Sequence, residues 1–190
     1  MLCHHVLEEG SSAPRFSLPG CIDGEMADFS LDETLARDRV ALLVFFPFDF
    51  SPVCTNELCA IRDAEWFQLT PEIDVWAISG DSVYAHRTFA EKYDFNFPLL
   101  SDCAGRVAES YDVCYEEWES HERIPQRAVF VVDSDRTIRY AWATEDAFEK
   151  PDFFPVKQSL DAIAAERDQF GPRNVELTVE YGEGPDQFSS

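Results

Sequence analysis

Two cysteines, Cys54 and Cys59, have the clearest potential for chemistry in this sequence. They lie in the segment "PFDFSPVCTNELCAIRD", directly after an apolar run at residues 40–46. Ser51 followed by Pro52 is typical of a helix start, with serine as the N-cap and proline at the first helical position. Cys54 should then lie in the first helical turn, where free backbone N–H groups and the helix dipole favour a thiolate. Because the thiolate is the nucleophilic form, Cys54 is the candidate reactive cysteine; the alternative is a small buried hydrophobic residue.

The spacing of the two cysteines limits what they can do together. Five residues along a regular helix separate the Cα atoms by about 8.6 Å and the side chains by roughly 140°. A disulfide needs a Cα–Cα distance below about 7 Å, so Cys54 and Cys59 can bond only if the first turn unwinds. A pair of this kind suits a reaction cycle with two states. A metal site is less attractive, since no nearby pair of cysteines or histidines completes four ligands.

Length and charge limit the number of domains and the kinds of partner that the protein can have. The 190 residues predict a single domain, residues 1–190, whose end at about 171–190 is a C-terminal extension of uncertain order. The formal net charge is -22, which disfavours nucleic acid and anionic membranes as partners. Only three of the basic residues are lysines, and an acidic, arginine-retaining surface indicates adaptation to a high-salt cytoplasm. An ordinary acidic protein is the alternative.

The sequence also predicts a cytoplasmic location. It has no apolar run of membrane-spanning length, and its N-terminus lacks the basic and apolar regions of a signal peptide. Six cysteines in a cytosolic protein of this size are more often catalytic or incidental than a disulfide framework.

The order of predicted elements indicates an α/β fold. The pattern predicts strands at residues 13–20, 25–31, 40–46, 73–79, 97–102, 127–133 and 138–143, and helices at 51–69, 82–93, 104–113 and 153–170. A right-handed crossover makes the central strands parallel, the last two strands form an antiparallel hairpin, and helices cover both faces. We therefore expect a thioredoxin-like fold, with a central mixed sheet and an N-terminal β-hairpin extension.

The cysteine segment resembles a known family. "PFDFSPVC" resembles the peroxiredoxin active-site pattern Pro-x-x-x-Thr/Ser-x-x-Cys, and "PQRAVFVVD" resembles the arginine-bearing strand of that family. The second cysteine at plus five resembles the bacterioferritin-comigratory (PrxQ-like) subgroup in particular. The resemblance extends over roughly residues 9–170.

The resemblance implies a role for each cysteine. Cys54 would be the peroxidatic cysteine, which attacks a peroxide oxygen and becomes a sulfenic acid. Cys59 would be the resolving cysteine, which condenses with the sulfenic acid to an intramolecular disulfide; otherwise it is a buried helix residue. A thioredoxin-like protein or a small thiol would then reduce the disulfide.

The resemblance also implies supporting residues. Ser51 would hold the peroxide through its hydroxyl, although the family more often has threonine there, and Pro47 would shield the sulfur from water. Arg127 would face Cys54 and stabilise its thiolate, unless it forms a surface salt bridge. Glu57 would bond within the arginine network, unless it lies on a solvated helix face.

The function implied is that of a thiol peroxidase for hydrogen peroxide or organic hydroperoxides, without metal, haem, flavin or other cofactor, as a monomer or homodimer. The alternatives are a one-cysteine peroxiredoxin resolved by an external thiol, and a peroxide sensor or adaptor without sustained turnover. A thioredoxin-like disulfide reductase is disfavoured, since the chain has no C-x-x-C. Any of Cys21, Cys103 and Cys114 could be an alternative resolving thiol, but none has a geometric claim like that of Cys59. The sequence assigns no role to Cys3 and suggests no partner for His86 or His121.

Overall fold

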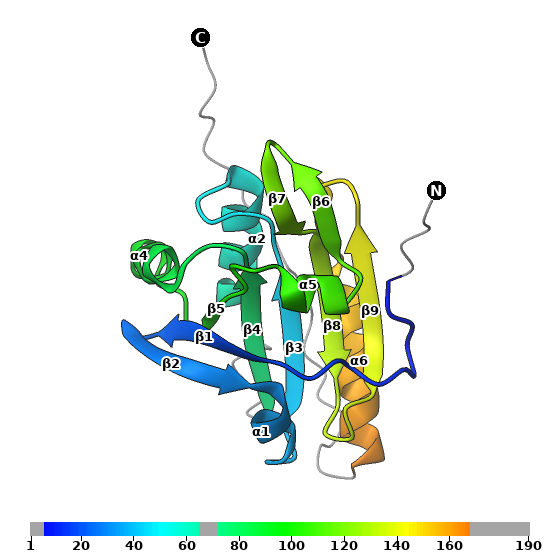
Figure 1. Ribbon diagram of the computed structural model, residues 1–190. Helices are drawn as coiled ribbons and strands as arrows, with labels where there is room; N and C mark the ends of the chain where they lie inside the picture. Colours follow the sequence, from blue (N-terminus) through cyan, green and yellow to red (C-terminus); the bar gives the residue numbers. More distant parts are fainter. Residues whose placement is uncertain (1–5, 65–71, 168–190) are drawn as a thin grey trace.

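A seven-stranded mixed sheet runs through the molecule in the order β2-β1-β5-β4-β3-β8-β9 (Figure 1). The computed structural model describes residues 6–64 and 72–167. The predictions for Cys3 and for the C-terminal extension lie outside these residues. The strands of the sheet are β1 (Ser17–Ile22), β2 (Glu25–Ser30), β3 (Val40–Phe45), β4 (Ile73–Ser79), β5 (Leu99–Ser101), β8 (Arg127–Val132) and β9 (Ile138–Thr144).

Strand pairing confirms the predicted mixed sheet. β3 and β4 are parallel, as are β4 and β5, whereas β8 is antiparallel to both β3 and β9. The N-terminal hairpin of β1 and β2 joins the sheet through an antiparallel pairing of β1 with β5. All six residues of β3 are buried, which explains why this strand reads as an unbroken apolar run.

Helices cover both faces of the sheet. They are α1 (Leu31–Leu35), α2 (Pro52–Asp63), α4 (Val83–Tyr93), α5 (Arg106–Ser110) and α6 (Phe153–Glu166). Figure 1 shows α5 in front of the sheet and α6 behind it. Side chains of α2, α4 and α6 pack with one set of alternating strand residues, and those of α1 and α5 pack with the other set. Within the described residues, no helix is long and apolar enough to cross a membrane.

Three local features differ from the expectation. α2 ends at Asp63, not near residue 69, because Ala64 is extended and its N–H donates to the Ile61 carbonyl; residues 65–71 lie outside the described part. The short helix α1 was not predicted, since its five residues are too few to show a helical period.

The third difference is a hairpin formed by β6 (Cys114–Trp118) and β7 (His121–Pro125), which stands apart from the main sheet. Its two loop residues, Glu119 and Ser120, have φ values of 49° and 62°. Such turns usually carry Asn-Gly or Asp-Gly, so the sequence lacks the common hairpin signal here.

Candidate active site

The start of α2 places Cys54 where the sequence predicts it. Ser51 is the N-cap, and its Oγ accepts a hydrogen bond of 3.4 Å from the Cys54 backbone N–H. Pro52 is the first helical residue. Cys54 therefore lies in the first turn, near the positive end of the helix dipole, with only 1% of its surface exposed.

Arg127 reaches the sulfur from the sheet. It is the first residue of β8, and strand alternation places it on the same face as Val129 and Val131, which pack in the core cluster that contains Cys54. One Nη2 hydrogen bond of 3.4 Å runs to the Cys54 Sγ, and another of 2.7 Å runs to the Ala147 carbonyl. A cation thus lies against a buried sulfur at a helix start, which is an arrangement that favours a nucleophilic thiolate.

Glu57 completes this charge cluster. Its side chain is fully buried and forms an ion pair with Nη1 of Arg127, so it does not lie on a solvated helix face. Burial raises the pKa of Glu57, and the charge of Arg127 opposes that shift. Burial alone would lower the pKa of Arg127, but the Glu57 carboxylate and the Cys54 sulfur hold it above its ordinary value. The carboxylate therefore keeps the buried guanidinium charged beside the sulfur.

Cys59 lies on the same uninterrupted helix as Cys54, and both thiols are free. Its side chain is half-buried and packs against the core cluster of α2. Burial raises the pKa of Cys59, and the nearby Arg62 opposes this effect. As long as the helix is intact, its geometry keeps the two sulfurs from bonding.

The loop between β9 and α6 contributes contacts that the sequence did not predict. Ala147 accepts a hydrogen bond from Arg127, and Lys150 Nζ donates one of 2.6 Å to the Asn56 side chain. The loop is thereby tied to both Arg127 and the first turns of α2. A backbone carbonyl and a single lysine leave no recognisable pattern in a sequence, so these partners could not be predicted.

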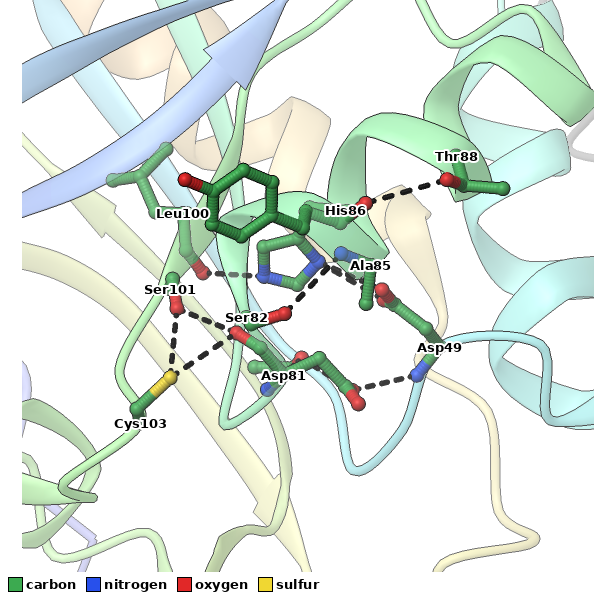
Figure 2. A network of polar contacts seen from close by, with 11 residues as sticks. Asp49, Asp81, Ser82, Ala85, His86, Thr88, Leu100, Ser101 and Cys103 are labelled. Atoms are coloured by element: carbon green, nitrogen blue, oxygen red, sulfur yellow. Dashed lines mark hydrogen bonds and ion pairs between the residues drawn. The ribbon is translucent and has the colours of Figure 1, made fainter.

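The turn between β3 and α2 carries Pro47, which is buried, and Asp49. Asp49 contacts His86 of α4, a histidine for which the sequence suggested no partner (Figure 2). Phe50 adopts a left-handed φ of 61°, just before the Ser51 cap. The turn that presents Ser51 and Cys54 is therefore held by contacts with α4.

The remaining cysteines have separate surroundings. Cys21 is buried in β1, and burial raises its pKa to about 11. Cys103 is exposed, with its sulfur 3.1 Å from the Ser101 Oγ, and Cys114 is half-buried at the start of β6. His121 contacts the Glu119 carbonyl and lies edge-on to Phe48. Cys3 lies outside the described residues.

Most of the chain is similar in sequence to known proteins. Residues 10–141 match the model of the AhpC/TSA family. A protein named putative peroxiredoxin bcp, from Coxiella burnetii, is 37% identical over 139 residues, which cover 72% of this chain and 88% of the relative. The chloroplastic peroxiredoxin Q of Oryza sativa subsp. japonica is 30% identical over 150 residues, 79% of this chain and 65% of that protein.

Solved structures share the fold. A crystal structure of peroxidoxin BcpB from Mycobacterium tuberculosis aligns with a TM-score of 0.68 and 27% identity, covering 84% of this chain and 97% of the other. The reduced 2-Cys peroxiredoxin of Plasmodium vivax aligns with a TM-score of 0.74 at 21% identity, covering 88% and 89%, and so supports the thioredoxin-like fold alone. The chain therefore belongs to the AhpC/TSA family of peroxiredoxins, which are thiol peroxidases.

Proposed function

We propose that this peroxiredoxin reduces hydroperoxides with Cys54 as the peroxidatic cysteine and Cys59 as the resolving cysteine. The observation that carries the proposal is the position of the Cys54 sulfur: it is buried at the N-terminus of α2, with the Arg127 guanidinium 3.4 Å away. Both the helix dipole and the cation stabilise negative charge on that sulfur.

In the first step, the Cys54 thiolate attacks one oxygen of the hydroperoxide. The S–O bond forms as the O–O bond breaks, and the leaving oxygen takes a proton and departs as water or alcohol. Cys54 is oxidised to a sulfenic acid while the peroxide is reduced. Arg127 donates to the oxygen that gains negative charge, and the Ser51 hydroxyl, which caps the helix beside Cys54, orients the peroxide.

In the second step, the Cys59 thiolate attacks the Cys54 sulfenic sulfur, a disulfide forms, and hydroxide leaves and is protonated to water. The first turns of α2 must unwind, which breaks the Ser51 cap, the 2.8 Å bond from Thr55 N–H to the Ser51 carbonyl, and the contact of Asn56 with Lys150. Each such bond contributes about 1 kcal/mol, so this local opening is accessible.

A thioredoxin-like protein, or two molecules of a small thiol, then returns two electrons and two protons, which regenerates both thiols. A one-cysteine cycle is the second candidate. It is favoured by the half-buried position of Cys59 in an intact helix, from which it cannot reach Cys54 without unwinding.

The test is peroxide consumption by the Cys54→Ser variant, compared with Cys103→Ser as a matched control in which an exposed thiol is removed. The proposal expects complete loss of turnover in the first variant and normal turnover in the second. Retention of a tenth of the wild-type rate by Cys54→Ser would refute the assignment.

A further inference from the structure

A fully buried histidine, His86, lies behind the turn that leads into α2 (Figure 2). Its Nδ1 is 2.9 Å from one carboxylate oxygen of Asp49 and 3.1 Å from the other. Its Nε2 is 3.0 Å from the Leu100 carbonyl oxygen of β5. Both ring nitrogens therefore face oxygen atoms, and the proposed peroxidase steps use neither.

These contacts require two protons. The Leu100 carbonyl can only accept a hydrogen bond, so Nε2 must carry a proton. The contact between Nδ1 and the Asp49 carboxylate needs a second proton, whereas a neutral imidazole has only one. Without it, the Nδ1 lone pair would face a carboxylate in a site closed to water, which is an unfavourable arrangement.

Asp49 is held from a second side. The Asp81 carboxylate, in the connection between β4 and α4, accepts a hydrogen bond of 2.8 Å from the Asp49 backbone N–H. The same carboxylate oxygen accepts one of 2.9 Å from Ser79 Oγ, so Asp81 is itself fixed. Asp81 thus binds the backbone of Asp49, and His86 binds its side chain.

The surroundings of the pair are acidic. Burial raises the pKa of Asp49, and the contact with His86 opposes that shift. Asp81 adds a negative charge that acts on Asp49, which favours retention of the shared proton. Among the described residues, the Asp81 carboxylate acts on Asp49, and the Cys103 thiol donates to the Asp81 backbone carbonyl. Asp49 in turn acts on the Cys21 thiol, which also lies within the influence of the charges of Arg87 and Glu91.

The anchored residue controls the geometry of the active-site turn. Phe50, which follows Asp49, has a left-handed φ of 61°, a strained conformation for a bulky side chain that persists only where neighbouring contacts impose it. Its ring packs on Phe89 of α4, with a centroid distance of 4.8 Å. The next residue is Ser51, the N-cap that fixes the backbone at Cys54. A release of Asp49 would therefore let the peroxide-binding turn relax.

We propose that His86 is a positioning residue for the reaction of Cys54 with peroxide, and that the proton it shares with Asp49 holds the active-site turn in its reactive geometry. The inference rests on the proposed function of Cys54. The contact is complete while the pair holds its proton and is lost as rising pH removes it. Alkaline pH should therefore slow the peroxide step even though it increases the thiolate fraction.

Two variants distinguish the effect of the second proton from the effect of the hydrogen bond between His86 and residue 49. In Asp49→Asn the amide can donate to an unprotonated Nδ1, so the contact survives without a second proton. In His86→Phe both donors are absent at every pH. Thr88→Ala is the matched control on α4, since Thr88 is exposed and its hydroxyl donates only to the Tyr84 carbonyl of the same helix.

The measurement is the rate constant for oxidation of Cys54 by hydrogen peroxide between about pH 6 and pH 10, divided by the rate constant for its alkylation by iodoacetamide at the same pH. Both reactions need the thiolate, so the ratio isolates the geometry of the peroxide step. The wild type and Thr88→Ala should lose about tenfold in this ratio at alkaline pH, which is less than the roughly 10²-fold loss that a 1 Å misplacement of reacting groups can cause. Asp49→Asn should show a flat ratio, and His86→Phe a flat ratio about tenfold lower.

A wild-type ratio that is independent of pH would overturn the proposal, as would an alkaline decrease that persists in Asp49→Asn. Should His86→Phe fail to fold, Asp49→Asn decides the question alone. Nitrogen NMR of His86 in the wild type gives an independent readout, because it reports whether both ring nitrogens hold the protons that their contacts require. A ring that lacks a proton on the Asp49 side under conditions of full peroxide reactivity would contradict the proposal. If Cys54 does not react with peroxide at all, the proposed function fails; if it reacts but the ratio is flat, only the role of His86 fails.

Discussion

Removal of Arg127 should have two separate consequences, one for stability and one for the peroxide reaction. Arg127 is 1% exposed and forms an ion pair with Glu57, which is fully buried. In Arg127→Met the Glu57 carboxylate loses its partner inside the core. Breaking a buried pair from one side costs about 3–5 kcal/mol of unfolding free energy, a large part of the stability of a domain of this size.

The stability loss should depend on pH in a defined direction. Burial raises the pKa of Glu57, and without Arg127 the main opposing interactions are lost, so that only the charge of Lys150 still counters this shift. The folded variant then holds a proton that the unfolded chain releases near pH 4.3. Because the folded state binds more protons above that pH, its stability should fall as pH rises from about 4.3 through the raised pKa of the folded state.

The double variant Arg127→Met with Glu57→Gln separates the two effects. A neutral amide beside a methionine leaves no buried charge, so much of the lost stability should be recovered and this pH dependence should disappear. The peroxide reaction should not recover, because the donor to the developing charge is still missing. A reduction of about 10²-fold in the rate constant is expected for one such donor.

The assays are urea unfolding at pH 5 and pH 8, and stopped-flow oxidation by hydrogen peroxide at matched protein concentration. Wild-type reactivity in the double variant would refute the role given to Arg127. Equal stability of the single variant at both pH values would refute the account of its ion pair with Glu57.

Two further predictions concern the second cysteine and the surface charge. Cys59→Ser should reduce one equivalent of peroxide at the wild-type rate and then stop with a thioredoxin-type reductant, because the Cys54 sulfenic acid cannot form its internal disulfide; unchanged turnover would favour the one-cysteine cycle. With a formal net charge of -22, the folded state repels itself, so the melting temperature should climb between about 0.01 M and 1 M salt, as the Debye length falls from about 30 Å to about 3 Å. A flat profile in calorimetry would contradict a salt-adapted surface.

Strong local signals made much of the fold predictable. The apolar run of β3 and the Ser51-Pro52 start of α2 are both where the sequence places them, because burial on two faces and helix capping act over a few residues. The hairpin of β6 and β7 was missed, because charged residues and a Glu119-Ser120 turn replace the usual pattern.

The candidate site was predictable only where a motif exists. Cys54 follows from helix geometry, and strand alternation accounts for the face on which Arg127 lies. The pairing of Asp49 with His86 joins residues 37 positions apart through the packing of α4 against the sheet, and neither residue type signals the other. The hydrogen bond from Arg127 to the Ala147 carbonyl depends on the path of a loop, and the pattern of side chains in the sequence does not predict that path.

The most direct test of the account is mass-spectrometric mapping of disulfides in the full chain after one equivalent of hydrogen peroxide. The account predicts that Cys54 and Cys59 of the same chain are linked, and that hydrogen exchange of residues 51–61 is faster than in the reduced protein, since the disulfide is incompatible with the first turns of α2. A disulfide from Cys54 to Cys21, Cys103 or Cys114, or to another chain, would contradict it.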